Sequence, residues 1–410
     1  MTDSQTNVTT NIATLPGLDR LWSKTKGDPQ ICVAILDGPV DQSHPCFEDA
    51  DLTRVQTLIA DAAGTGIMSG HGTHITSVIL GRHGSPVSGI APDCRGLIVP
   101  VFSDKLSRKL SQIDLARGIN QAVEAGAHII NISGGQLSQS GEADPILANA
   151  VRACNENNVL IVAAAGNDDC ECLHVPAALD SVLAVGAMNA QGLPFDFSNW
   201  GETYQTQGIL APGEKVLGAK PGGGTTFKSG TSFAAPIVSG IAALLLAIQL
   251  QQEEKPDPHA IRKAIIESAL PCSPETEPDS RRCLAGHLNI LGAYNLISQG
   301  DTTIVPEEES VIQLSNETNS LNPSESEVVV LPTPETSEQL APSAAGVQAA
   351  EMVATSETMP STSSNSGNTM TAMSNNTLVS SVTPSSVQPS GNCGCDGQVA
   401  PSAIPGAPSQ

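Results

Sequence analysis

Short apolar runs alternate with helical repeats along the first 298 residues of the chain. The apolar runs have the length of buried strands and stop at glycine or polar residues; they predict β-strands at 31–37, 96–101, 127–132, 159–165 and 182–187. The other segments have the apolar content or spacing of buried or amphipathic helices; they predict helices at 70–81, 111–126, 145–157, 232–252 and 258–270. Strands and helices in this alternation predict an α/β fold, with a mostly parallel central sheet covered on both faces.

Three polar residues stand at the carboxyl ends of predicted strands, namely Asp37, Ser133 and Asn167. The strands of a parallel sheet share one carboxyl edge, and binding and catalytic sites gather outside it. We therefore expect the functional site at this edge. The helix predicted for 232–252 is apolar almost throughout, so we expect it to pass through the core.

The composition changes abruptly after residue 300. Residues 301–410 contain 12 acidic residues and no Lys, Arg, Phe, Trp or Tyr. Such a segment cannot bury enough apolar surface to offset the entropy lost when a backbone becomes ordered. We expect one folded domain over residues 1–300, followed by a low-complexity, acidic and disordered tail over 301–410. The tail could tether pathway partners or only add solubility.

The net charge of −23 excludes some classes of partner. Without the tail, 30 acidic residues still face 19 basic ones, so we expect no binding to nucleic acid or to anionic membrane. The N-terminus lacks the pattern of a secretory signal, and about 30 residues before the first strand leave no room for a folded pro-segment. We expect a cytoplasmic protein.

The ten cysteines are interpreted mainly as small buried residues, because a reducing compartment opposes stable disulfides. The spacing of Cys272 and Cys283 suits a bridge, and C-x-C pairs occur at 170–172 and 393–395. The sequence leaves open whether any of these cysteines form disulfides. No histidine spacing typical of zinc accompanies them, so we expect no metal and no cofactor.

Three motifs carry the chemistry: ILDGPVDQSHP around Asp37, GHGTH around His71 and SGTSFAAP around Ser232. With these motifs in this order, the sequence resembles the subtilisin-like (subtilase) family over roughly residues 16–296. The resemblance implies a three-layer subtilisin-like fold and a serine endopeptidase. Each residue alone also has a structural interpretation, as a turn acid, a helix N-terminal residue or an N-cap. Asp41 is an alternative acid, which we place in the turn after the strand.

The residue types fit this chemistry. A serine hydroxyl is a weak nucleophile, so a base must take its proton as it attacks the carbonyl carbon. Neutral histidine suits this role because its pKa lies near working pH. The resemblance implies that Ser232 attacks, that His71 is the base, and that Asp37 orients His71. It also implies that Asn167 and the Ser232 backbone N–H form the oxyanion hole. The substrate-binding residues that it implies are Ser133, Gly134, Gly135 and Gly166.

The sequence departs from the family pattern in two places. Gly38 and Pro39 stand where most members carry a hydroxyl residue and then glycine, so the surroundings of Asp37 must be built differently. The segment 82–89 has no carboxylate, so we expect the family's calcium site to be lost. After Asn167, the acids Asp168, Asp169 and Glu171 form either a substrate-facing rim that favours basic residues or a solvated loop.

A closer resemblance comes from the segment LPGLDRLWSKTKGDPQICVAILDGPVDQSHPCF together with the tail. These features are similar to the cyanobactin maturation proteases, which cut the leader from a ribosomal precursor peptide. The resemblance implies a peptide or precursor-peptide substrate. A broad-specificity intracellular subtilase and an inactive subtilase-fold binding scaffold are the alternatives. The sequence does not determine the residue preference at the cut, the role of the tail or the oligomeric state.

Overall fold

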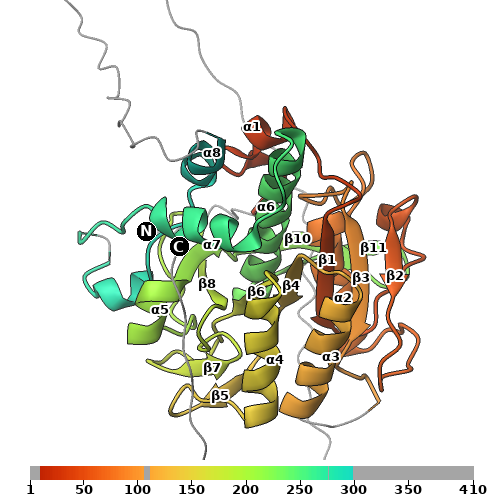
Figure 1. Cartoon of the computed structure of the whole chain (residues 1–410), viewed down its shortest axis with the longest axis horizontal. Coiled ribbons are helices and arrows are strands. Elements are labelled where there is room, and N and C mark those ends of the chain that lie inside the picture. Colours follow the sequence, from red (N-terminus) through yellow and green to blue (C-terminus); the bar gives the residue numbers. More distant parts are fainter. Residues whose placement is uncertain (1–9, 106–110, 276, 299–410) are drawn as a thin grey trace, which may run out of the picture. The chain divides into compact units, whose positions relative to one another are not determined.

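A computed structural model describes residues 10–105, 111–275 and 277–298 of the chain (Figure 1). The tail predicted for 301–410 lies outside the described residues. The strands are β1 (Cys32–Asp37), β2 (Leu52–Arg54), β3 (Arg95–Pro100), β4 (Ile129–Ile132), β5 (Gln136–Ser138), β6 (Leu160–Ala164), β7 (Leu173–Val175), β8 (Leu183–Met188), β9 (Gly208–Pro212), β10 (Val216–Lys220) and β11 (Gly224–Lys228). The α-helices are α1 (Leu18–Trp22), α2 (Ile67–Leu80), α3 (Gln112–Glu124), α4 (Pro145–Glu156), α5 (Glu202–Gln207), α6 (Thr231–Gln251), α7 (Pro258–Glu267) and α8 (Ile290–Ser298).

Seven strands form the central sheet, in the order β2-β3-β1-β4-β6-β8-β9. Each neighbouring pair in this sheet is parallel, so the predicted α/β class and the mostly parallel sheet are confirmed. Strands β1, β4 and β6 are consecutive neighbours, and their carboxyl ends precede or carry the three polar residues singled out in the sequence. The sheet thereby brings Asp37, Ser133 and Asn167 to one edge.

Alternate residues of β1 enter two different cores, as expected for a strand with both faces covered. Val33 and Ile35 pack with α2 and α6 in one apolar cluster. Ala34 and Leu36 pack with α3 and α4 in the other cluster. Figure 1 shows α3 and α4 side by side on the same side of the sheet. The structure therefore has three layers.

Helix α6 is buried over almost all of its 21 residues. Its length and mean hydropathy of 2.1 would suffice for a membrane span, but 94% of its most apolar window is buried inside the fold. This burial is typical of the core helix of a soluble protein. The helix packs against β4, β6, β8 and β9, and its N-terminus therefore lies near the carboxyl edge of the sheet.

Helix α2 begins three residues before the predicted start at 70. The carboxylate of Asp104 accepts hydrogen bonds from the backbone N–H groups of Met68, at 2.7 Å, and Ser69, at 3.2 Å. An acceptor supplied from a distant part of the chain satisfies the free N–H groups of the first turn and favours a longer helix. His71 consequently lies inside the first turns of α2 rather than at its start.

The short strands were not predicted. Strands β10 and β11 form an antiparallel hairpin, and β5 pairs with β7 across 34 intervening residues of chain. The hairpin contains glycines and is partly exposed, so it lacks the apolar run of a buried strand. Its strand β10 packs against α2.

His74 on α2 is completely buried beneath this hairpin. Its Nε2–H donates to the carbonyl oxygen of Val216 at 3.1 Å, and its ring packs edge-on against Phe233. A Cβ at Gly218 would lie 2.5 Å from the ring, so β10 can pass this close only with glycine there. Burial lowers the pKa of His74 to about 3, and the Lys228 cation adds to the shift. The side chain is therefore neutral near neutral pH.

A histidine that is neutral when folded makes the protein sensitive to acid. Between pH 6.5 and about 3, the unfolded state binds a proton at His74 that the folded state does not. Stability therefore falls as the pH drops below 6.5, by roughly 1.4 kcal/mol per pH unit from this group. We predict that His74→Gln, which keeps an N–H donor for Val216, weakens this dependence.

The measurement is the free energy of urea unfolding at pH 7 and pH 5 for both proteins. All other titrating groups are shared, so the difference between the two slopes isolates His74. The wild type should lose about 2 kcal/mol more than the variant over this interval. Equal losses would show that His74 is not held neutral by the fold.

Candidate active site

Asp37 and His71 form the best-defined polar pair at the carboxyl edge of the sheet. Asp37 is the last residue of β1 and has no exposed surface, whereas the side chain of His71 on α2 is 17% exposed. His71 Nδ1 lies 2.8 Å from Asp37 Oδ1 and 3.0 Å from Oδ2. A carboxylate accepting from Nδ1 fixes the ring orientation and leaves Nε2 for another partner.

Two glycines allow α2 to approach the end of β1. A Cβ at Gly38 would collide with the backbone carbonyl of Met68, and a Cβ at Gly72 would lie 2.5 Å from the carbonyl oxygen of Gly38. Gly38 N–H also donates to Asp37 Oδ1 at 2.7 Å. The residue that departs from the family pattern thus serves two purposes here: it gives room to the helix and a hydrogen bond to the buried carboxylate.

Ser232 is the second residue of α6 and is partly exposed at the same edge. Its neighbour Phe233 packs against the ring of His71, with ring centroids 5.3 Å apart. This contact brings the first turn of α6 beside His71. Within residues 10–105, 111–275 and 277–298, no hydrogen bond joins Ser232 Oγ to His71.

Lys228 adds a positive charge near the ring of Phe233 and the first turns of α2. Its Nζ donates to the carbonyl oxygen of Gly70 at 3.3 Å and lies 5.7 Å from the centroid of the Phe233 ring. Burial lowers the pKa of Lys228, and the Asp37 carboxylate opposes that shift. Sequence patterns did not indicate this residue, because the β10–β11 hairpin that carries it was not predicted.

Asn167 follows β6 and faces the N-terminus of α6. Its Oδ1 accepts from the backbone N–H of Thr231 at 3.0 Å and from the Thr231 hydroxyl at 3.1 Å. Because Oδ1 already accepts from the N–H and the hydroxyl of Thr231, the side-chain NH₂ is the part of the exposed Asn167 amide that is available to a ligand. Thr231, which the sequence interpretation missed, also accepts from Gly166 N–H at 3.3 Å. Its position next to Ser232 was the signal that could have identified it.

Ser133 and the glycines after it connect β4 to β5. Ser133 is buried, and its Oγ accepts from Asn131 Nδ2 at 2.9 Å. Asn131 Oδ1 in turn accepts from Ser239 Oγ on α6, also at 2.9 Å. These buried hydrogen bonds join the end of β4 to the core helix. The hydroxyl of Ser133 therefore has a structural partner, while Gly134 and Gly135 remain partly exposed.

The acidic residues after Asn167 do not form an unpaired rim. Asp168 Oδ2 lies 2.6 Å from His174 Nε2, and Glu171 Oε2 accepts from Arg281 at 2.9 Å. Asp169 donates its N–H to the carbonyl of Phe197. Of the two alternatives, the substrate-facing rim of free acids is not supported, because two of the three carboxylates pair with basic side chains.

Asp41, the alternative acid, has partners elsewhere. Its Oδ1 accepts from Ser43, and its Oδ2 accepts from Gly222 N–H at 2.8 Å. These bonds hold the turn after β1 against the β10–β11 connection. Asp37 is the carboxylate that contacts His71.

Two of the cysteine pairs that the sequence left open are bonded, Cys170 with Cys172 and Cys272 with Cys283. Cys32, Cys46, Cys94 and Cys154 are free and buried, as interpreted from the sequence. Burial raises the pKa of Cys46 to about 12, which keeps this thiol protonated. The pair 393–395 lies outside the described residues.

Potential metal ligands are dispersed over the described part of the chain. In residues 10–105, 111–275 and 277–298, no three His, Cys, Asp or Glu side chains gather at a site that could hold an ion. The loop 82–89, where the family binds calcium, is closed by protein contacts. Arg82 pairs with Asp93 at 2.7 Å, His83 Nε2 donates to Gly89 O at 2.9 Å, and Val87 is buried.

Comparisons with known proteins agree with this geometry. The model of the subtilase family matches residues 28–293. The structure of the prenylagaramide maturation protease PagA is 61% identical, with a TM-score of 0.66, and the match covers 70% of this chain and 99% of PagA. The resemblance to maturation proteases predicted from the sequence is thereby confirmed.

Curated relatives are more distant. The thermophilic serine proteinase of Bacillus sp. (strain AK1) is 31% identical over 229 residues, which cover 55% of each chain, so this chain spans about half the length of that relative. The major intracellular serine protease of Bacillus subtilis (strain 168) is 33% identical over 234 residues, which cover 55% of this chain and 71% of the relative. The family model, these relatives and the fold agree, and the chain belongs to the subtilase family of serine proteases.

Proposed function

We propose that this protein is a serine endopeptidase that removes the N-terminal leader from a ribosomally made precursor peptide. The observation that carries the proposal is the 61% identity to PagA over 99% of that chain, because PagA is named a maturation protease. The Asp37–His71 pair beside the N-terminus of α6 supports the peptidase part of the proposal.

In the proposed mechanism, Ser232 Oγ attacks the scissile carbonyl carbon while His71 Nε2 takes the hydroxyl proton. Asp37 holds the ring and stabilises the imidazolium that forms. His71 then gives the proton to the leaving amine, the C–N bond breaks, and an ester joins the leader to Ser232. Water, deprotonated by His71, hydrolyses this ester and releases the leader with a free carboxylate.

The negative charge on the carbonyl oxygen needs donors that are already in position. We assign this role to the Asn167 side-chain NH₂ and the backbone N–H of Ser232. The two hydrogen bonds from Thr231 hold the Asn167 amide, so little reorganisation accompanies the reaction. The N-terminus of α6 adds the positive end of its helix dipole.

The substrate would lie along the segment between β4 and β5. We assign substrate binding to this segment and to the glycine before Asn167, a set made up of Ser133, Gly134, Gly135 and Gly166. Backbone groups at the end of a strand can pair with an extended peptide as an added strand. Gly166 has φ +110°, a conformation that favours glycine and lets the substrate backbone approach closely.

Two alternative functions are a broad intracellular peptidase and an inactive binding scaffold. A broad intracellular subtilase is supported by the similarity to the major intracellular serine protease of Bacillus subtilis. An inactive binding scaffold would have no need for the bond between Asp37 and His71 or for the ordered Asn167. We favour leader removal because the identity to PagA far exceeds that to the broad relatives.

We extend the proposal to location and partners. The similarity to an intracellular protease supports a cytoplasmic enzyme. The acidic segment 301–410, which lies outside the described residues, is a candidate tether to other proteins of the same route. Cleavage of a peptide substrate and tethering by the segment 301–410 are separate proposals, because we expect the reaction at Ser232 to require only the folded domain.

Digestion of a leader-bearing precursor peptide tests the function. We predict one cut at the boundary between leader and core, detected by mass spectrometry, and slow or absent digestion of casein. Ser232→Ala should remove the cut and leave the thermal midpoint nearly unchanged, since only one hydroxyl is lost. Cuts scattered along the precursor, with casein digested equally fast, would favour a broad peptidase. Full activity of Ser232→Ala would contradict the assigned nucleophile.

A second prediction concerns the residues that hold the oxyanion donor. Asn167→Ala should lower kcat by about 10² to 10³, the magnitude known for an equivalent donor in subtilisin itself. Thr231→Val removes one of two bonds to Asn167 Oδ1 and should cost about tenfold in kcat. Thr231→Ser keeps the hydroxyl and is the matched control. The measurement is kcat on one short peptide. Equal rates for the Val and Ser variants would show that the Thr231 hydroxyl does not position Asn167.

A further inference from the structure

A cavity of about 760 Å³ lies between α3 and the segment 54–60, which begins at the end of β2. Pro100 and Val101, at the end of β3, complete its lining. Its volume is in the range of sites that bind small ligands or side chains of a peptide. Among the described residues that line it, none belongs to the set assigned above to catalysis or substrate binding.

Hydrogen bonds tie the walls of this cavity to one another. Thr57 Oγ1 donates to the carbonyl oxygen of Pro100 at 2.6 Å, which joins the segment 54–60 to the end of β3. Gln121 Nε2 on α3 donates to the carbonyl oxygen of Gln56 at 2.7 Å, which joins the same segment to the helix. Because the three walls are connected, the cavity keeps its shape without a ligand, and a ligand would not have to order it.

The lining offers an apolar surface and an excess of positive charge. Leu58 is 66% exposed, although it stands on the wall of the cavity. Two arginines, Arg54 and Arg117, face a single carboxylate, Asp114, in a chain whose net charge is −23. This combination suits a ligand that carries both a carboxylate and an apolar side chain.

The two arginines differ in how far the protein already engages them. Arg54 Nη2 donates to the carbonyl oxygens of Ile59, at 2.9 Å, and Asp61, at 2.7 Å, so this guanidinium supports the wall. Arg117 is 60% exposed, and its ion pair with Asp114 is long, at 3.8 Å. An exposed pair of this length holds a guanidinium weakly, so Arg117 is the cation that a ligand can engage.

The end of β3 connects the cavity to the proposed substrate path. The backbone N–H groups of Val101 and Phe102 donate to the carbonyl oxygen of Asp37 at 2.8 and 3.2 Å. Phe102 also reaches the segment after β4, because a Cβ at Gly134 would lie 3.2 Å from its ring. Residues 100–102 therefore border the cavity at one end and the proposed substrate-binding segment at the other.

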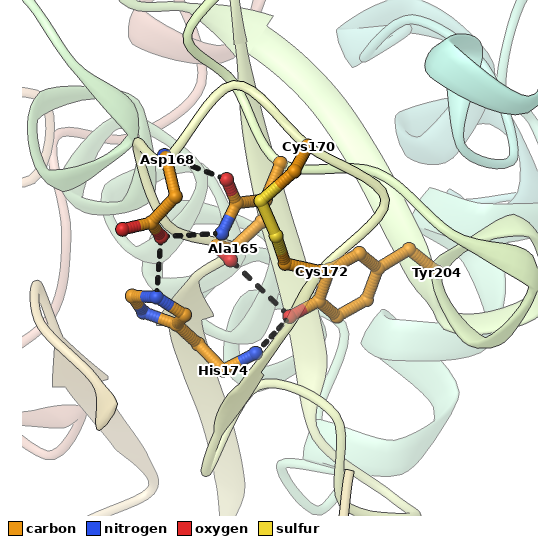
Figure 2. The surroundings of a disulfide bond; sticks show 7 residues. Ala165, Asp168, Cys170, Cys172, His174 and Tyr204 are labelled. Atoms are coloured by element: carbon orange, nitrogen blue, oxygen red, sulfur yellow. Dashed lines mark hydrogen bonds and ion pairs between the residues drawn. A yellow bond between two sulfur atoms is a disulfide. The ribbon is translucent and has the colours of Figure 1, made fainter. Parts of the chain in front are cut away.

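The opposite side of the segment 133–135 is filled by protein. Strand β5 pairs there with β7, and a Cβ at Gly135 would lie 3.1 Å from His174 Nδ1. Figure 2 shows His174 held by Asp168, at 2.6 Å between Nε2 and Oδ2, beside the disulfide of the same loop. A peptide that continues beyond the segment 133–135 is therefore directed toward the side of Phe102 and the cavity.

We propose that this cavity is a second binding site for the substrate, which takes an acidic and apolar segment upstream of the cut. A Glu or Asp side chain of that segment pairs with Arg117, and a neighbouring apolar side chain covers Leu58. An extended chain spans roughly 26 Å in about eight residues, so the segment can lie several residues from the scissile bond. This inference rests on the proposed peptidase function and adds to it a recognition site outside the catalytic centre.

Binding at two places has a kinetic signature. Once one part of the substrate is bound, the contact of the other part becomes intramolecular, and the affinity of the whole substrate rises. A contact far from the reacting atoms is made equally in the ground state and in the transition state. It therefore lowers KM and leaves kcat nearly unchanged.

The experiment uses the full-length chain and quenched peptides that share one cleavage sequence, selected from a random library so that the test does not depend on the natural substrate. Upstream of this sequence, Gly-Ser spacers of about two, six or ten residues, which span up to roughly 33 Å, end in Leu-Glu-Leu-Glu, in Leu-Gln-Leu-Gln or in no extension. The readout is kcat/KM relative to the unextended peptide with the same spacer. Leu-Glu-Leu-Glu should raise it by about tenfold at the best spacer length, through KM, and Leu-Gln-Leu-Gln by about threefold.

Variants of the cavity test its two contacts. Arg117→Glu should remove the advantage of Leu-Glu-Leu-Glu and give one to Leu-Lys-Leu-Lys, because the charge on the wall is reversed. Arg117→Lys keeps the charge and should keep the advantage within about twofold. Leu58→Ser should lower the advantage of both Leu-containing extensions by about threefold.

Arg152→Glu is the matched control. Arg152 lies on α4, is 66% exposed, and pairs with Glu156 at 3.8 Å, the same distance as between Arg117 and Asp114. This variant makes the same change of charge outside the cavity and should leave every ratio unchanged.

Two results would overturn the proposal: no advantage of Leu-Glu-Leu-Glu at any spacer length, or an advantage that Arg117→Glu lowers no more than Arg152→Glu does. Ser232→Ala extends the test to slow substrates, because it should bind the peptides without cutting them. By fluorescence anisotropy, it should bind the Leu-Glu-Leu-Glu peptide about tenfold more tightly than the unextended one, and equal affinities would contradict the second site. Failure to cut a precursor at its leader–core boundary would count against leader removal alone, since the library peptides carry no leader.

Discussion

Burial of helix α6 is the constraint on which the site depends. The helix is apolar on all sides and is covered by strands and helices along most of its length, so it cannot slide or tilt without exposing its core residues. Its first turn is thereby fixed at the carboxyl edge of the sheet. Thr231 there binds Asn167, and Phe233 contacts the ring of His71. The position of Ser232 follows from the packing of the whole helix.

The buried carboxylate of Asp37 imposes a second requirement. A carboxylate with no exposed surface is costly unless donors surround it. The donors here are the N–H of Gly38 and Nδ1 of His71, and both depend on the close approach of α2. Glycines at 38 and 72 permit that approach. The same hydrogen bond that makes burial of Asp37 tolerable also orients the imidazole, so stability and the proposed catalysis share one interaction.

Sequence patterns predicted five of the seven strands of the central sheet, its main helices and the edge at which Asp37, Ser133 and Asn167 meet. Long apolar runs and helical repeats are local signals of strands and helices. Because the strands of a parallel sheet share one carboxyl edge, these signals also predict where the functional site lies. Motifs then supplied the residues of the proposed triad. The role of Thr231 toward Asn167 was missed because it is visible only when β6 and α6 are brought together.

His174 was missed for a related reason. It lies on a three-residue strand whose partner, β5, is distant in the sequence, and its contacts to Gly135 and Gly166 arise from pairing that no local pattern records. The acids after Asn167 were visible, but their pairing with His174 and Arg281 was not. The pairing of the two bonded cysteine pairs also stayed open, because spacing in the sequence does not show whether two thiols lie close together in the fold.

We propose that Ser232 is a nucleophile activated by His71, which Asp37 orients. A serine-directed fluorophosphonate tests it directly, because stable phosphonylation requires an activated hydroxyl and donors for the phosphoryl oxygen. The folded enzyme is labelled, digested and mapped by mass spectrometry, with His71→Ala and heat-unfolded enzyme as controls. We expect a single adduct on the peptide that contains Ser232, and strongly reduced labelling in both controls. An unlabelled wild type, or an adduct on a different serine, would contradict it.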